Sequence, residues 1–306
     1  MVILAAVLVG ALPVDWWISD LLANARLHLF VAALLLVPFC RQIGALRQGW
    51  LLAGIGIGGL VLSLGGVELR RHSAPADSNV LRITTFNLHA AQADADKTTR
   101  YLEDQDVDVI VLLEIASRWQ REARTLTSRY PYSIVDTRNG VFGISIFSRH
   151  PLTERQTLTF PESDIPFIRV QVDFHGIPVT VYGARVTWPV TPSSYSVRNK
   201  QLEHLEAILN ETEGPLILCG DFNLTPHSVH YRRFLSGAQV TDIDDLRRYA
   251  GSWPSALSVL GIPIDHCFAR SPYLVEAKHI GPWLGSDHRP ATFSIALVDE
   301  VDRDSP

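Results

Sequence analysis

Cysteine is scarce in this chain of 306 residues, which contains only Cys40, Cys219 and Cys267. The three lie far apart, so they match neither the spaced pairs of a zinc site nor the Cys-rich pattern of a disulfide framework. Cys219 and Cys267 lie in apolar, strand-like segments, where free cysteine behaves as a small hydrophobic residue. The cysteine content therefore does not indicate in which cellular compartment the protein is found.

An excess of basic residues is also missing. The chain has 27 Lys and Arg against 32 Asp and Glu, a formal net charge of −5 at pH 7. Residues 1–67 hold three of these basic and two of these acidic residues, so the remainder carries a net charge of −6. Domains that grip nucleic acid backbones usually carry positive charge. Composition therefore disfavours, without excluding, binding to nucleic acid.

Charge is absent from residues 48–67, a length that matches the ~20 residues a helix needs to cross a bilayer. Residues 1–14 and 27–40 also lack Asp, Glu, Lys and Arg. Tryptophans flank these stretches like interfacial anchors: Trp16, Trp17 and Trp50. We predict a membrane module of about three transmembrane helices at residues 1–67. A cleaved signal peptide is the alternative for the first stretch, but it lacks a basic leader and a small-x-small cleavage site.

The charges of the two predicted loops differ. The loop before the second apolar stretch carries Asp15, Asp20 and Arg26. The loop after it carries Arg41 and Arg47 and no acid. Because basic loops stay in the cytoplasm, the chain beyond the third stretch is expected outside it. Two arginines directly after the third stretch favour the opposite orientation.

A polar linker at residues 68–79 separates the apolar region from a main domain at residues 80–298, and residues 299–306 are expected to form a flexible tail. In the main domain, β-type runs alternate with amphipathic segments. Strands are predicted at residues 80–88, 107–115, 132–137, 140–148, 168–174, 177–186, 215–220, 262–269 and 291–297, and helices at residues 95–105, 118–128, 193–210 and 228–236. This order predicts an α/β fold with two packed sheets flanked by helices.

Polar residues follow or interrupt the predicted buried strands: Asn87, Glu114, Asp221, Asn223, Asp265, Asp287 and His288. One carboxylate at a strand end is usually a cap or a loop-ordering group. Several in one domain favour a shared site, because packed strands bring their ends to a common edge. Carboxylate and amide oxygens without cysteine are suited to Mg²⁺ or Mn²⁺. Such ions commonly serve phosphate chemistry.

Seven motifs span residues 80–298 in order: TTFNL, VLLEI, GISIFSRHPL, RNKQLEHL, CGDFNLTP, IDHCF and GSDHRP. With these motifs the chain resembles the endonuclease/exonuclease/phosphatase superfamily, which has the deoxyribonuclease I fold. More narrowly, it is similar to bacterial members with N-terminal membrane helices. The resemblance implies a four-layer α/β sandwich, two mixed sheets flanked by helices, behind N-terminal transmembrane helices. It also implies a multi-pass protein of the cell inner membrane, which with the loop charges gives an extracytoplasmic catalytic domain.

The resemblance implies a phosphoester hydrolase that depends on Mg²⁺, with Mn²⁺ as the alternative ion. Its implied metal ligands are Glu114, Asn87 and Asp287. Asp221 would activate water and Asn223 would orient it, while His288, held by Asp265, would bind the phosphate. His89 stays open as a further phosphate contact.

The chain departs from the family at Arg185, where members usually have His or Tyr. Arginine stays protonated and cannot give a proton to a leaving oxygen, although it can neutralise phosphate charge. One hypothesis is a hydrolase in which Arg185 clamps the substrate and water supplies the proton. The other is a membrane-tethered phosphate binder with feeble catalysis.

Family members act on DNA, phosphoinositides, sphingomyelin and other phosphoesters, and the fold does not choose among them. The net negative charge and the predicted membrane anchor slightly favour a lipid or a small phosphoester as substrate. DNA cleavage is the alternative.

Overall fold

The computed structural model describes residues 2–12, 14–65, 79–90, 92–138, 140–243, 251–257, 260–270 and 273–297. Of the predicted linker at residues 68–79, only Asn79 belongs to this part of the chain. The predicted tail at residues 299–306 lies outside it.

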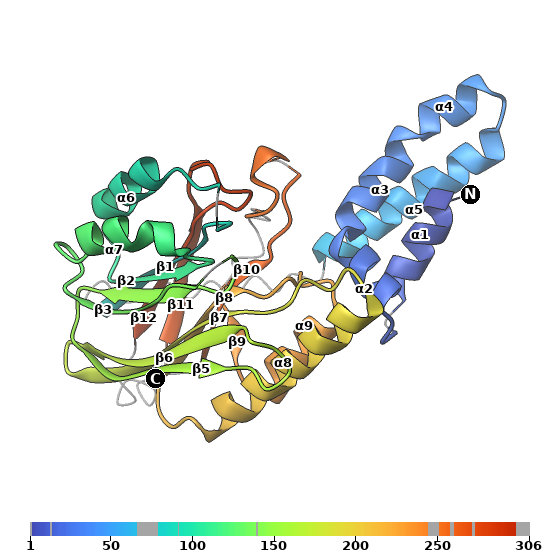
Figure 1. Ribbon diagram of the computed structural model, residues 1–306. Helices are drawn as coiled ribbons and strands as arrows, with labels where there is room; N and C mark the ends of the chain where they lie inside the picture. The colour runs from blue at the N-terminus through green and yellow to red at the C-terminus, as the bar shows by residue number, and fades with distance from the viewer. Residues whose placement is uncertain are drawn as a thin grey trace, which may run out of the picture.

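The main domain is built on two mixed sheets, each with six strands in the described part of the chain (Figure 1). The first sheet has the order β11-β12-β1-β2-β4-β3. Its strands are β1 (Asn79–Asn87), β2 (Val109–Leu113), β3 (Tyr132–Asp136), β4 (Ile144–Ser148), β11 (Tyr273–Ile280) and β12 (Ala291–Leu297). The second sheet has the order β5-β6-β7-β8-β10-β9. Its strands are β5 (Leu152–Thr159), β6 (Pro166–Phe174), β7 (Ile177–Arg185), β8 (Leu216–Asp221), β9 (Thr241–Asp242) and β10 (Asp265–Arg270).

Helices cover the outer faces of both sheets. Helices α6 (Ala95–Asp104) and α7 (Gln120–Leu126) lie on the first sheet, and α8 (Pro192–Glu211) and α9 (Val229–Gly237) lie on the second (Figure 1). Two short 3₁₀ helices, η1 (Ser117–Trp119) and η2 (Ser255–Leu257), lie in loops. The predicted architecture of two packed mixed sheets flanked by helices is confirmed.

Strand β2 shows how the apolar sequence gives this layering. Val109, Val111 and Leu113 pack between the two sheets, and Ile110 and Leu112 pack against the helices of the first sheet. Successive strand side chains point to opposite faces, so a strand covered on both faces has no polar alternation. Each large apolar side chain buried in this way contributes roughly 1.5–3 kcal/mol.

All nine predicted strands are present, but β5, β9 and β11 were not predicted. In β5 only Leu152 is buried, while the other side chains are exposed or half-buried. The strand therefore lacks the period-two apolar pattern by which a half-buried strand is recognised. Its position is set by backbone pairing with β6.

The N-terminal region forms five helices, named here the N-terminal module: α1 (Val2–Ala11), α2 (Trp17–Asn24), α3 (Arg26–Leu35), α4 (Val37–Gln42) and α5 (Leu46–Gly65). The second apolar stretch forms two helices rather than one, with Pro38 in the first turn of α4. Proline has no amide hydrogen and interrupts a continuous helix. Helices α3, α4 and α5 extend away from the sheets (Figure 1).

Among the residues described, no helix is by itself long and apolar enough to cross a membrane. Helix α2 and the segment Arg26–Gln42, which comprises α3 and α4, are bent by 68° relative to each other and meet this requirement of length and composition only together. The expected three transmembrane helices thus stay a prediction.

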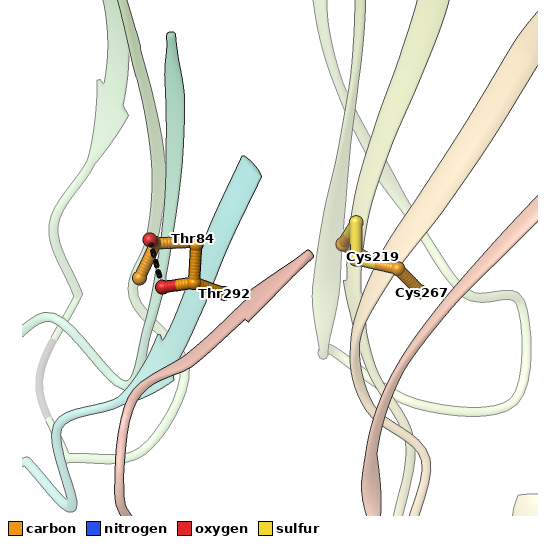
Figure 2. Close-up of a disulfide and its surroundings, with 4 residues drawn as sticks. All are labelled: Thr84, Cys219, Cys267 and Thr292. Atoms are coloured by element: carbon orange, nitrogen blue, oxygen red, sulfur yellow. Dashed lines mark hydrogen bonds between the residues drawn. A yellow bond between two sulfur atoms is a disulfide. The ribbon is translucent and has the colours of Figure 1, made fainter. Parts of the chain in front are cut away.

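The structure contradicts the reading of Cys219 and Cys267 as free thiols, because they form a disulfide (Figure 2). The two residues face each other directly in the antiparallel pair of β8 and β10, with Cα atoms 4.1 Å apart. Figure 2 shows Thr84 and Thr292 on the other sheet, where their hydroxyl groups are hydrogen-bonded at 2.8 Å. The two cysteines are 48 residues apart in the sequence, so the sequence alone did not indicate that they pair.

We expect the double variant Cys219→Ala/Cys267→Ala to unfold at lower denaturant concentration than the wild type. By loop-closure entropy a crosslink that spans 48 residues contributes about 4 kcal/mol. Urea titration of the full chain in detergent, compared with a Cys40→Ser control, measures the difference. Thiol labelling after unfolding without reductant should find one free cysteine; three labelled cysteines would refute the bond.

Candidate active site

The two central parallel strand pairs place their carboxyl ends at the same edge of the domain. In the first sheet Asn87 of β1 lies opposite Leu113 of β2, directly before Glu114. In the second sheet Arg185 of β7 lies opposite Asp221 of β8. Asp221 also faces Asp265, the first residue of antiparallel β10. Pairing within each sheet and packing between the sheets thus collect residues separated by up to 178 positions.

Asn87 joins the carboxylates of the two sheets. Its Nδ2 donates to Oε1 of Glu114 at 3.1 Å and to Oδ2 of Asp221 at 3.1 Å. All three side chains are buried. Glu114 has a φ of 56°, in the left-handed region. Such backbone costs about 1–3 kcal/mol and is concentrated at functional sites.

Arg185 contacts the predicted metal ligand. Its Nε lies 2.7 Å from Oε1 of Glu114. The N–H does not meet the geometry of a hydrogen bond, so the contact is an ion pair. Oε1 therefore serves both Asn87 and Arg185, whereas Oε2 is buried without a hydrogen-bond partner among the described residues.

His288 and Asp265 form a buried pair. Nδ1 of His288 lies 2.8 Å from Oδ2 of Asp265, and its Nε2 lies 3.8 Å from Oδ2 of Asp221. Burial alone would lower the pKa of His288, but the carboxylates of Asp265, Asp221 and Asp287 raise it to about 9. The imidazole is therefore a cation at neutral pH and presents Nε2 toward Asp221.

Asp221 occupies the centre of this cluster. Burial raises the pKa of its carboxyl group to about 6, against the opposing charges of His288 and Arg185. Its Oδ1 accepts the backbone N–H of Asn223 at 3.1 Å. The Asn223 side chain donates instead to the carbonyl of Val186 at 3.0 Å and so links this loop to the end of β7.

Asp287 lies beside the central cluster and contacts a different set of residues. Its Oδ1 lies 2.8 Å from Nδ1 of His89, and its Oδ2 accepts from Nε1 of Trp253 at 3.0 Å. The backbone N–H of His89 donates to Oδ1 of Asn87 at 2.9 Å, which ties these residues to the central cluster. His89, left open by the sequence, therefore contacts a predicted site residue.

Sequence reasoning missed the residues that hold the loop around His288. Ser286 accepts from the backbone N–H of His288 at 3.0 Å and donates to the carbonyl of Asn87 at 2.7 Å. Ser255 donates to the carbonyl of Ser286 at 2.7 Å. Trp253 was missed as well. Trp253 and Ser255 lie outside the seven motifs. Ser286 belongs to the motif GSDHRP, so it alone could have been identified from the sequence.

Among the described residues, one group brings three possible metal ligands close together. One ligand atom each from Asp221, Asp265 and His288 lie within 4.8 Å of one another. A cationic imidazole is a poor ligand, however, because coordination requires its neutral form. Oε2 of Glu114, which has no hydrogen-bond partner among the described residues, and Oδ1 of Asp287, which contacts His89, are hard oxygen donors of the kind that Mg²⁺ or Mn²⁺ prefers. The residues present thus fit a hard divalent cation.

Two packed sheets with a carboxylate, amide and histidine cluster at one edge define the class of deoxyribonuclease I-like proteins. The profile of the Endonuclease/Exonuclease/phosphatase family matches residues 84–288. The chain belongs to this family.

Solved structures share the fold. An endonuclease/exonuclease/phosphatase from Beutenbergia cavernae is 20% identical with a TM-score of 0.61, over 72% of each chain. The TDP2 of D. rerio in complex with a single-strand DNA product is 17% identical with a TM-score of 0.59, over 71% of this chain and 99% of that one. Sphingomyelinase C from Streptomyces griseocarneus is 17% identical with a TM-score of 0.55, over 72% of this chain and 99% of that one. No curated protein matches the chain significantly.

Proposed function

We propose that the protein is a membrane-anchored phosphoester hydrolase that depends on a divalent metal, Mg²⁺ or Mn²⁺. One observation carries this proposal. A continuous set of buried contacts joins a carboxylate with a free oxygen at Glu114, a carboxylate of raised pKa at Asp221 and a histidine cation at His288. Binding of phosphate alone would not require a general base such as Asp221 beside the His288 cation, which Asp265 holds in place. The arrangement therefore favours catalysis over binding alone.

Asp221 is the proposed general base. A base is most effective when its pKa lies near the working pH, and burial brings the pKa of Asp221 to about 6. It takes a proton from water as the water oxygen attacks phosphorus. The bond from phosphorus to the leaving oxygen then breaks, and the leaving oxygen takes its proton from solvent.

Two cations of the chain stabilise the phosphate. His288 donates from Nε2 to a phosphate oxygen, while Asp265 holds its other nitrogen. Arg185 pairs with the developing negative charge, since its contact with Glu114 leaves its other guanidinium nitrogens available. Glu114, with Asn87 and Asp287, would hold the metal ion, which offsets charge on the phosphate oxygens when bound.

The favoured substrate is a lipid or a small phosphoester. The net charge of −6 outside residues 1–67 opposes the DNA backbone. Among proteins of the same fold, a sphingomyelinase C supports this choice, and TDP2 with its DNA product supports DNA as the alternative. A feeble phosphate binder is the remaining alternative, because Arg185 cannot supply a proton.

Membrane anchoring by the N-terminal module is supported by its exposed apolar side chains. Large ones on α3, α4 and α5 are exposed to solvent: Val31, Leu35, Phe39, Leu46, Trp50, Leu51, Ile57 and Val61. Apolar surface of this extent is typical of contact with a membrane or a partner. Because these helices project away from the sheets, we favour a membrane over a protein partner as the surface that they contact (Figure 1).

Two features support an extracytoplasmic catalytic domain at residues 80–298. The disulfide between Cys219 and Cys267 fits an oxidising compartment. Asp15 and Asp20 contact this domain, so α2 and the residues just before it lie on the side of the domain, whereas Arg41 belongs to α4 at the far end of the module (Figure 1). Basic residues remote from the domain agree with its placement outside.

The proposed orientation predicts that a periplasm-dependent reporter fused after residue 306 is active in bacteria. A cytoplasm-dependent reporter at the same point should be silent. The reverse pattern would place the domain in the cytoplasm.

A substrate panel tests the proposed function directly. The full chain in detergent is incubated with an activated phosphodiester, sphingomyelin, phosphoinositides and plasmid DNA, with Mg²⁺ or with chelator. We expect metal-dependent hydrolysis of the activated ester and of a lipid. Cleavage of DNA alone would replace the lipid assignment, and turnover equal to that of Glu114→Ala would favour the binder.

Arg185→His is expected to increase hydrolysis of esters with poor leaving groups. Histidine can donate a proton to the leaving oxygen, and a general acid typically contributes ~10²–10⁴ in rate. Activated esters, whose leaving groups need no proton, should gain little. Comparing the two ester classes measures the effect, and a loss on both would show that Arg185 has an essential role.

A further inference from the structure

Helix α2 and Asp15, which lies just before it, contact the catalytic domain through polar side chains. Residues 1–67 contain only two acidic residues, Asp15 and Asp20, and both contact this domain. Oδ1 of Asp15 accepts from the Tyr195 hydroxyl at 2.7 Å, and Oδ2 of Asp15 lies 2.7 Å from Nη1 of Arg233. The acids that interrupt an otherwise apolar region therefore dock it on helices α8 and α9.

The contact made by Asp20 is fully buried. Its Oδ2 accepts from Nη2 of Arg198 at 2.7 Å, and neither side chain is exposed. Its Oδ1 accepts from the hydroxyl of Ser228, which also caps α9 by accepting from the N–H of His230 at 3.1 Å. Loss of one partner from such a buried pair leaves an uncompensated charge and is strongly destabilising. Arg198 of α8 therefore holds α2 in place.

Asn24 contacts the loop that follows the catalytic strand β8. Its Oδ1 accepts from the backbone N–H of Thr225 at 2.9 Å and from the Thr225 hydroxyl at 3.0 Å. Thr225 is fully buried and follows Asn223 by two residues and Asp221 by four. Without Asn24, two buried donors of Thr225 would lose their acceptor, a state that proteins avoid by moving the group to water.

We propose that Asn24 and Asp20 are positioning residues: they fix residues 222–228, and through them Asp221 and Asn223, so that hydrolysis requires α2 to be seated on the catalytic domain. Asn24 holds the loop at Thr225, and Asp20 holds its end at Ser228. The hydrogen bond that fixes the water-activating group, from the N–H of Asn223 to Oδ1 of Asp221, lies just before Thr225, the first residue of the loop that α2 holds. This inference rests on the proposed function, since its catalytic readout is phosphoester hydrolysis.

The test uses the full chain in detergent, with an activated phosphodiester and Mg²⁺. Asn24→Ala should lower kcat by about 10- to 100-fold, as is typical for residues that orient a site from outside it, and leave KM unchanged. Asn24→Asp retains the acceptor oxygen and should restore kcat. Asp15→Ala is the matched control, because it removes a contact of the same module that lies outside α2, while Asp20 and Asn24 still hold α2 on the loop.

Hydrogen exchange of residues 222–228 gives a readout that is independent of activity. Exchange should be faster in Asn24→Ala than in the wild type, Asn24→Asp and Asp15→Ala. Wild-type kcat and exchange in Asn24→Ala, or equal effects of Asp15→Ala and Asn24→Ala, would overturn the inference. If the wild type itself has no turnover, the proposed function fails, and the exchange comparison alone decides whether α2 holds the loop.

Discussion

Replacement of Glu114 by glutamine is expected to abolish most metal-dependent hydrolysis, with a loss of at least about 10²-fold. A metal ion contributes several kcal/mol of charge stabilisation, and each 1.4 kcal/mol corresponds to a factor of ten. The amide keeps the volume of the side chain and an acceptor for Asn87. It removes the charge that would hold the ion, and with it the ion pair to Arg185. The rate of activated-ester hydrolysis at saturating Mg²⁺ measures the effect.

Glu122→Gln is the matched control for this substitution. Glu122 is also a buried glutamate paired with an arginine, but it lies on α7 and pairs with Arg121. Calorimetric titration with Mn²⁺ separates loss of binding from loss of catalysis. Glu114→Gln should bind Mn²⁺ more weakly and Glu122→Gln should bind it normally; undiminished binding by Glu114→Gln would place the metal elsewhere.

Replacement of His288 by glutamine is expected to lower kcat by about 10²- to 10³-fold, the usual effect of removing one donor that stabilises transition-state charge. Glutamine can donate a hydrogen bond but carries no charge. The fold should survive, because Ser286 holds the backbone N–H of residue 288 independently of the side chain. Circular dichroism and kcat measured on the same sample distinguish the two effects.

The wild-type rate should depend on pH in a bell shape. Asp221 acts as an anion, so activity is lost as the pH falls through its pKa of about 6. His288 acts as a cation, so activity is lost as the pH rises through its pKa of about 9. Asp265→Asn removes the nearest carboxylate and should move the alkaline limb to lower pH, whereas an unmoved limb would mean that another group titrates there.

The strands and the chemistry of their ends were predictable from the sequence. A run such as residues 107–115 is apolar throughout because β2 is covered on both faces, and this pattern depends only on local sequence. Glu114 and Asp221 stand out for the same reason, as charges at the ends of buried runs. Parallel neighbours end at a common edge, so the predicted convergence needed no knowledge of side-chain contacts.

Apart from the pair of His288 and Asp265, which the family resemblance implied, the contacts between these residues were not predictable. Arg185 was identified as a departure from the family, but its pairing with Glu114 depends on how the second sheet packs on the first. His89 and Trp253 reach Asp287 from separate loops, which no periodicity describes. Strand β5 escaped prediction because its exposed side chains carry no pattern, and only its pairing with β6 defines it.

The sequence by itself determined the layers of this protein, the identity of its polar strand-end residues and the apolar character of its N-terminal region. Only the tertiary structure decided that Cys219 bonds to Cys267 and that Asp20 and Asn24 contact the catalytic domain. The physical reason is the range of the interactions. Apolar periodicity is a local property of the chain, whereas strand register and helix docking bring together residues whose separation carries no signal of their contact.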